Sequence, residues 1–155
     1  MRLYLVQHGE AVEKEINPDR PLSPKGSKQV QTVVNFLKPA GVPPPEIWHS
    51  GKARAHETAE IFAKHLPSKA KVKKVEGLNP QDPVADIAKK LRDRERDLMI
   101  VGHLPHLSEL AALLLTGAQK GEPVAFERGG VLCLEQTEPG QWSVRWMVVP
   151  SLLGA

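Results

Sequence analysis

The chain has 155 residues, of which 41% are hydrophobic and 25% charged, and this composition predicts a single globular domain spanning residues 1–155. No apolar run approaches the roughly 20 residues of a membrane-spanning helix, so we expect no membrane association. The lone cysteine, Cys133, excludes an intramolecular disulfide and a cysteine-based zinc site, and we expect it to be buried. The formal net charge of +3 is mild and suits a site for an anion, and the N-terminal residues lack a signal-peptide pattern, so we expect a cytoplasmic protein.

The first half of the chain alternates between predicted strands and helices. Residues 2–7 have the apolar run of a buried parallel strand, and Ser23 and Pro24 suit the first positions of a helix that ends before Pro39. Residues 46–49 predict a second strand. Residues 69–76 alternate lysine with apolar residues, as an edge strand does. The two helices have inner faces at helical spacing: Val30, Val33, Val34 and Leu37 in one, and Ala55, Ala59, Phe62 and Leu66 in the other.

The second half continues the alternation and ends in a hairpin. Asp82 and Pro83 open a predicted third helix, residues 98–101 predict a buried strand, and Gly117 closes a fourth helix. Residues 131–135 and 142–149 predict an antiparallel hairpin around Pro139 and Gly140. The chain is therefore predicted to be an α/β three-layer sandwich, with a mostly parallel central sheet, helices on both faces and a C-terminal antiparallel hairpin.

Polar side chains follow three of the predicted strands, where ligands bind in parallel sheets. His8 and His103 each come directly after a buried strand, and Arg54 lies in the first turn of a helix that Ser50 is expected to cap. A cation there opposes the helix dipole, and a bound anion would reverse the penalty. These residues indicate a phosphate site, although histidines with satisfied hydrogen bonds at strand ends remain an alternative.

The same residues carry a resemblance to a known family. Residues 5–11 (Leu-Val-Gln-His-Gly-Glu-Ala) resemble the Arg-His-Gly signature of the histidine phosphatase superfamily, which includes the phosphoglycerate mutases. Residues 50–59 resemble its Ser-Pro-x-x-Arg-Ala-x-Gln-Thr-Ala segment, and residues 101–103 its second-histidine motif. Residues 20–26, the His103-Leu104-Pro105 sequence and the short chain are similar to those of the SixA-like phosphohistidine phosphatases. The resemblance runs from residue 2 to the hairpin and implies a phosphoglycerate mutase-like fold.

The resemblance also implies a reaction and a set of roles. His8 would be the catalytic nucleophile that becomes phosphorylated, Arg54 and Arg20 would hold the phosphoryl group, and His103 would donate a hydrogen bond to it. Contacts to the phosphate from Gln7 and Gly9 are also expected, and Glu10 is a possible proton carrier. No metal or organic cofactor is implied. The implied partner is a phosphohistidine-bearing protein, such as a phosphotransfer domain, or a small phosphorylated substrate.

Gln7 departs from the resemblance, because the family signature has arginine at this position. Glutamine keeps an amide donor but lacks the positive charge, which we expect to weaken phosphate binding by ~1–2 kcal/mol. Lys52 and Arg128 are candidates for a compensating cation. Leu104 and Pro105 follow His103, so the dedicated acid with which the phytase-like branch protonates an alkoxide leaving group is missing. An imidazole leaves more easily, which favours phosphohistidine as the substrate.

Several other readings remain open or are disfavoured. A small-molecule phosphomonoesterase and a phosphate- or phosphohistidine-binding module with weak turnover are both alternatives. His8-Gly9-Glu10, with His103 and His106, resembles a metal-hydrolase set only superficially, because neither C-x-x-C nor H-E-x-x-H occurs. No nucleic-acid-binding signature is present, so no nucleic-acid partner is expected. The remaining histidines receive no role, and His106 is expected at the surface.

Overall fold

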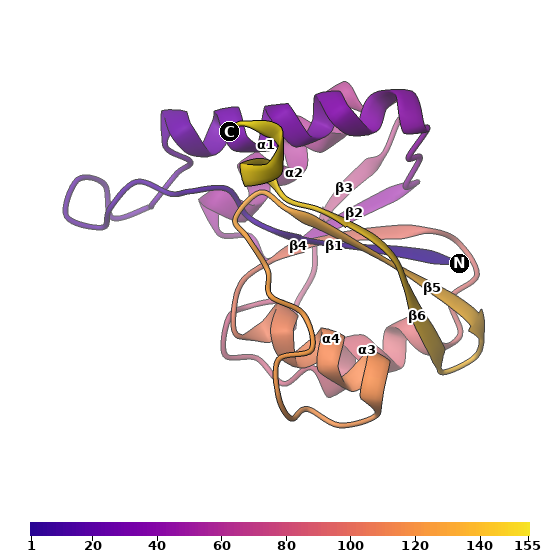
Figure 1. The fold of residues 1–155 in the computed structure, drawn as a ribbon. Coiled ribbons are helices and arrows are strands. Elements are labelled where there is room, and N and C mark those ends of the chain that lie inside the picture. Colours follow the sequence, from indigo (N-terminus) through magenta and orange to yellow (C-terminus); the bar gives the residue numbers. More distant parts are fainter.

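The computed structural model describes residues 1–155 as a six-stranded sheet between two helical layers (Figure 1). The strands follow the order β3-β2-β4-β1-β5-β6 across the sheet. Their bounds, in chain order with the helices, are β1 Arg2–Gln7, α1 Pro24–Leu37, β2 Glu46–His49, α2 Ala53–His65, β3 Lys71–Lys74, α3 Ala85–Arg92, β4 Leu98–Gly102, α4 His106–Thr116, β5 Val131–Glu138 and β6 Gln141–Val148. The predicted α/β three-layer fold is confirmed.

Parallel pairing brings the carboxyl ends of three strands to one edge of the sheet. β4 pairs in parallel with both β1 and β2, in a register that sets Gln7 opposite Gly102 and His49 opposite Val101. β5 runs antiparallel to β1 and forms the C-terminal hairpin with β6. The segments that follow β1, β2 and β4 therefore emerge side by side, and the segment that precedes β5 joins them at the same edge.

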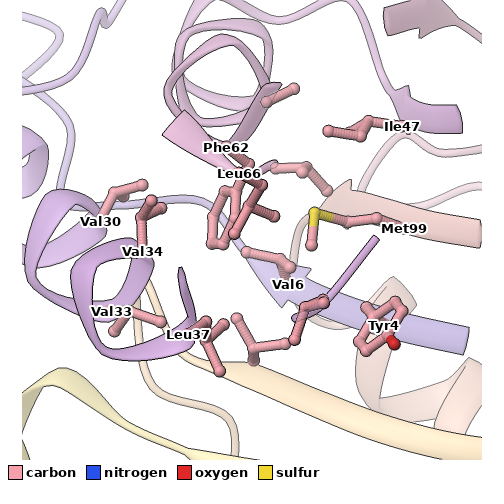
Figure 2. Close-up of a cluster of buried hydrophobic side chains, with 14 of the residues drawn as sticks. Tyr4, Val6, Val30, Val33, Val34, Leu37, Ile47, Phe62, Leu66 and Met99 are labelled. Carbon is pink, nitrogen blue, oxygen red and sulfur yellow. The ribbon is translucent and has the colours of Figure 1, made fainter. Parts of the chain in front are cut away.

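Each face of the sheet is covered by one helical pair. α1 and α2 lie on one face and α3 and α4 on the other (Figure 1). Side chains alternate along β1, so Tyr4 and Val6 pack under α1 and α2, while Leu3 and Leu5 pack under α3 and α4. Figure 2 shows the first cluster, in which Phe62 is fully buried. Cys133 belongs to this cluster and is also fully buried, as predicted.

Element boundaries differ from the predictions at a few places. α2 begins at Ala53 with Lys52 as its N-cap residue, so Ser50 does not cap it, and Leu66 lies just beyond its end. α3 begins two residues after Pro83. β3 is confirmed as an edge strand with exposed lysines, although it is shorter than predicted. None of the helices has the length and apolar character that crossing a bilayer requires.

Candidate active site

A pocket of about 230 Å³ lies at the edge of the sheet where the parallel strands end. Five of its lining residues are among the predicted site residues: Gln7, His8, Arg20, Arg54 and His103. Ala11, Pro80, Leu104 and Arg128 complete the lining. The structure therefore brings together residues that are separated by up to 121 positions in the chain.

His8 is held by its own backbone in one ring form. Its amide donates to the Gly102 carbonyl across 3.1 Å, and its Nδ1 lies 2.7 Å from the Gly9 carbonyl oxygen. Because a carbonyl can only accept, Nδ1 carries the hydrogen and Nε2 keeps a lone pair. Burial lowers the pKa of His8 to about 4, against the opposing hydrogen bond to Gly9. The ring is therefore neutral at pH 7.

His103 follows β4 and lies beside His8, with 5.0 Å between the ring centroids. Its Nε2 is 2.6 Å from the hydroxyl oxygen of Ser50, and its Nδ1 is buried without a hydrogen-bond partner. Burial, followed by the charge of His8, lowers the pKa of His103 to about 3. This second ring is also neutral at pH 7, with one nitrogen free for a ligand.

Three arginines line the pocket, and no aspartate or glutamate does. Arg54 lies in the first turn of α2, where burial and then the charge of Arg20 lower its pKa, and its Nε is buried without a partner. Arg20 has a φ of 48°, a left-handed conformation rare for a residue with a side chain, and its Nε donates to the Val12 carbonyl across 3.1 Å. These contacts leave the positive charges without a balancing anion inside the pocket.

Two residues predicted for the site, Gly9 and Glu10, have other contacts, and so does Ser50, which was predicted as the helix cap. The Ser50 hydroxyl bonds His103 and accepts a 3.3 Å hydrogen bond from the amide of Lys52, the N-cap residue, so Ser50 lies two residues before the cap position. Gly9 does not line the pocket: its amide donates to Thr58 Oγ1 across 3.2 Å. Glu10 also lies outside the lining, and its carboxylate accepts a 2.8 Å hydrogen bond from the Ser23 hydroxyl.

Two further histidine and arginine placements differ from the sequence analysis. His106 was expected at the surface and is fully buried, because its position four residues before Leu110 puts it on the core-facing side of α4. Arg128 was only a candidate for a compensating cation, and it lines the pocket. Lys52 does not line it. The sequence held a signal for Arg128. It lies three residues before β5, which runs antiparallel to β1 and therefore starts at the edge of the sheet where β1 ends.

Three of the seven buried side-chain nitrogen and oxygen atoms that lack a hydrogen-bond partner lie in this pocket, and the other four belong to Ser68, Arg94 and His106. Gln7 Oε1, Arg54 Nε and His103 Nδ1 all belong to the pocket lining and have no protein partner, although each is buried. Buried polar groups normally find a partner, so a cluster of exceptions points to a ligand. Two neutral imidazoles and three guanidinium groups around a small space are suited to a tetrahedral oxyanion.

Comparisons with known proteins agree with this chemistry. Residues 3–83 match the family model described as histidine phosphatase superfamily (branch 1). An uncharacterized protein of Picosynechococcus is 31% identical over 142 residues, which cover 86% of this chain and 84% of that protein.

Two solved structures have the same fold. The protein histidine phosphatase SixA complexed with tungstate superimposes with a TM-score of 0.88 and 23% identity, over 99% of each chain. A putative alpha-ribazole-5'-P phosphatase of Escherichia coli superimposes with a TM-score of 0.79 and 18% identity, over 97% of this chain and 98% of that one. The family match, which spans more than half of the chain, shows that this protein belongs to branch 1 of the histidine phosphatase superfamily and is a phosphatase of that family.

Proposed function

We propose that this protein is a phosphohistidine phosphatase, which removes the phosphoryl group from a histidine of another protein through a phospho-His8 intermediate. The observation that carries the proposal is the composition of the pocket: two neutral histidines, three arginines and no carboxylic acid. Each part of this composition corresponds to one requirement of the reaction.

The first requirement is a nucleophile with a free lone pair. The Gly9 carbonyl fixes the hydrogen of His8 on Nδ1, which leaves Nε2 to attack phosphorus. The low pKa of about 4 keeps the ring unprotonated throughout the neutral range, so no separate base is needed. Attack forms an Nε2–P bond while the bond from phosphorus to the leaving group breaks.

The second requirement is positive charge around the phosphoryl oxygens. Phosphoryl transfer is catalysed mainly by positioning and by stabilising charge on the equatorial oxygens. Arg54 and Arg20 supply guanidinium groups. The free ring nitrogen of His103 supplies a further donor when its other nitrogen accepts the hydroxyl hydrogen of Ser50. Each charged hydrogen bond of this kind contributes about 1.5–3 kcal/mol.

The third requirement concerns the leaving group, and it selects the substrate. An alkoxide needs a proton from an enzyme acid as it leaves, and no carboxyl group lines the pocket. A phosphohistidine ring takes a proton from solvent on its free nitrogen and then leaves as neutral imidazole, whose conjugate acid has a pKa near 6.5. A phosphohistidine P–N bond therefore suits this pocket better than a phosphate ester. Water then attacks phospho-His8, releases inorganic phosphate and restores the free histidine.

The fold alone does not choose the substrate. The solved structures that share it include a protein histidine phosphatase and a putative alpha-ribazole-5'-P phosphatase. The alternative is therefore a small phosphate ester, for which Glu10 would have to swing from Ser23 toward the leaving oxygen.

The test is phosphate release from a phosphohistidine-bearing phosphotransfer protein. We expect wild-type protein to release phosphate well above background and His8→Ala to remove that activity, because the nucleophile is lost. His56→Ala is the matched control, since His56 is exposed, pairs with Glu60, stacks on His49 and lies outside the pocket lining. Its rate is expected to match that of wild type. A covalent phosphoryl adduct on His8, found by mass spectrometry after an alkaline quench, would identify the intermediate.

Two results would contradict the proposal. The first is a kcat/KM that is higher on sugar or aryl phosphates than on the phosphohistidine protein, which would favour the phosphomonoesterase. The second is tight phosphate binding without release from any of these substrates, which would indicate a binding module.

A further inference from the structure

Gln7 gives the pocket lining a neutral group where the family signature has arginine. It is the last residue of β1, only 8% exposed, and its Oε1 has no partner. An amide can donate one hydrogen bond to a phosphoryl oxygen but adds no positive charge. The charge that a dianionic phosphoryl group requires must therefore come from elsewhere in the lining.

A tight turn holds Arg128 against this same residue. The amide of Gly129 donates to the backbone carbonyl of Gln7 across 2.8 Å, and the amide of Gly130 donates back to the Glu127 carbonyl across 2.9 Å. Gly129 has a φ of +78°, which favours glycine and lets the chain reverse here. The Arg128 backbone is therefore directly adjacent to the end of β1.

The other side of the turn is tied to the C-terminal segment. The Glu127 carboxylate accepts hydrogen bonds from the amide and the hydroxyl of Ser151, at 2.8 and 2.6 Å. Contacts on both sides of Arg128 fix the point from which its side chain leaves the backbone. A long side chain that starts from a fixed point loses less conformational entropy when it binds a ligand.

The Arg128 side chain reaches the reacting ring. It lines the pocket beside Gln7 and His8, and after burial its charge contributes to the low pKa of His8, behind Arg54 and ahead of Arg20. Nη1 lies 3.9 Å from Oε1 of Glu10, the only carboxylate paired with it. The guanidinium is half exposed and so is free to turn toward a ligand.

Lys52 provides a contrast because it lies outside the pocket. It is the exposed N-cap residue of α2 and does not line the pocket. After burial, its charge contributes to the low pKa of His103, behind the charges of His8 and Arg54. Of the two candidate cations, only Arg128 stands where Gln7 lacks a charge.

We propose that Arg128 is a phosphate-binding residue that supplies the positive charge absent from Gln7, so that the Gln7 amide and the Arg128 guanidinium together hold the phosphoryl oxygens. The inference rests on the proposed function only in taking a phosphoryl group as the ligand. It predicts that the two positions are coupled: arginine at residue 7 makes Arg128 dispensable.

The test measures binding of inorganic phosphate by titration calorimetry at constant ionic strength. Arg128→Gln is expected to weaken binding about tenfold, because one charge-assisted hydrogen bond of an exposed guanidinium is lost. Lys52→Gln removes the same charge from a neighbouring surface and is expected to change binding less than twofold. In the Arg128→Gln background, Gln7→Arg is expected to recover most of the loss.

The outcomes separate this inference from the proposed function. If wild-type protein does not bind phosphate, both fail. If it binds phosphate and Arg128→Gln binds equally well, only the role of Arg128 is overturned. Equal losses in Arg128→Gln and Lys52→Gln would also overturn it, because they would indicate a general field effect. Unchanged thermal unfolding of Arg128→Gln would show that the variant is folded, as its exposed position leads us to expect.

Discussion

The interior of the sheet and the pocket at its edge satisfy opposite requirements. Beneath α1 and α2 the side chains are apolar, close-packed and fully buried, so nothing there lacks a partner. A few residues farther along the same strands, buried nitrogens lack partners and cations lie close to one another. The interior stabilises the fold. The unsatisfied groups of the pocket lower stability, but they form a site at which an anion can bind.

Phe62→Ala is expected to have the largest effect on stability, because it removes packing from the interior. Phe62 is fully buried on the inner side of α2, and removing its ring leaves a cavity and loses the transfer free energy of the deleted atoms. We expect the free energy of unfolding to fall by about 3–5 kcal/mol in urea titrations. Phosphate affinity per folded molecule should remain near that of wild type. A loss of affinity as large as the loss of stability would mean that core and pocket are not separate in energetic terms.

Gly26→Ala would act at the boundary between the two regions. Gly26 lies in the first turn of α1, and a Cβ there would come within 2.0 Å of the Glu10 carbonyl oxygen in the segment after His8. Alanine gains about 1 kcal/mol of helix propensity, but the backbone has to move, so we expect a net loss of about 2 kcal/mol. Because that segment carries the site, phosphate affinity should also fall. Lys28→Ala, on the exposed side of α1, should change stability by less than about 0.5 kcal/mol.

Acid should reduce the stability contributed by the buried histidines of the pocket, while the apolar interior has no group that titrates in this range. A histidine whose folded pKa is depressed favours folding fully above its unfolded pKa near 6.5, and this contribution is lost as the pH falls toward the folded value. For His103, with a pKa of about 3, lowering the pH from 7 to about 5 should remove on the order of 1–2 kcal/mol of stability.

The measurement is urea unfolding at the two pH values. His103→Asn should lose less stability on acidification than wild type, whereas the exposed control His56→Asn should behave as wild type does. Saturating phosphate should reduce the acid loss, because an anion favours the charged ring. An equal acid loss in wild type and His103→Asn would show that this ring is not the source.

Most of the fold and much of the site followed from local patterns. The apolar runs of β1 and β4 and the 3.6-residue spacing in α1 predicted their elements because burial of one face decides them. His8, Arg54 and His103 were predicted together because the ends of parallel strands converge.

The remainder depended on pairing that no local pattern encodes. Arg128 reaches the pocket only because β5 runs antiparallel beside β1, and the Ser50 hydroxyl bonds a histidine that follows a distant strand. Gly9, expected to contact phosphate, is engaged by Thr58 of α2. These three differences are all contacts between elements far apart in the chain, where many partners compete for one polar group.

The smallest expected effect has the opposite sign to the others. Arg54 lies in the first turn of α2, where its charge opposes the helix dipole and lies near that of Arg20, and its buried Nε has no partner. Arg54→Met keeps the apolar stem of the side chain and removes all three penalties. In phosphate-free buffer we expect the free energy of unfolding to rise by about 0.5–1 kcal/mol. Phosphate, which stabilises wild type by mass action, should stabilise the variant far less at the same concentration.

Both quantities come from thermal unfolding with and without phosphate. A variant that is less stable than wild type in phosphate-free buffer would show that Arg54 also supports the fold, and that the division between a satisfied interior and an unsatisfied pocket does not hold at this residue.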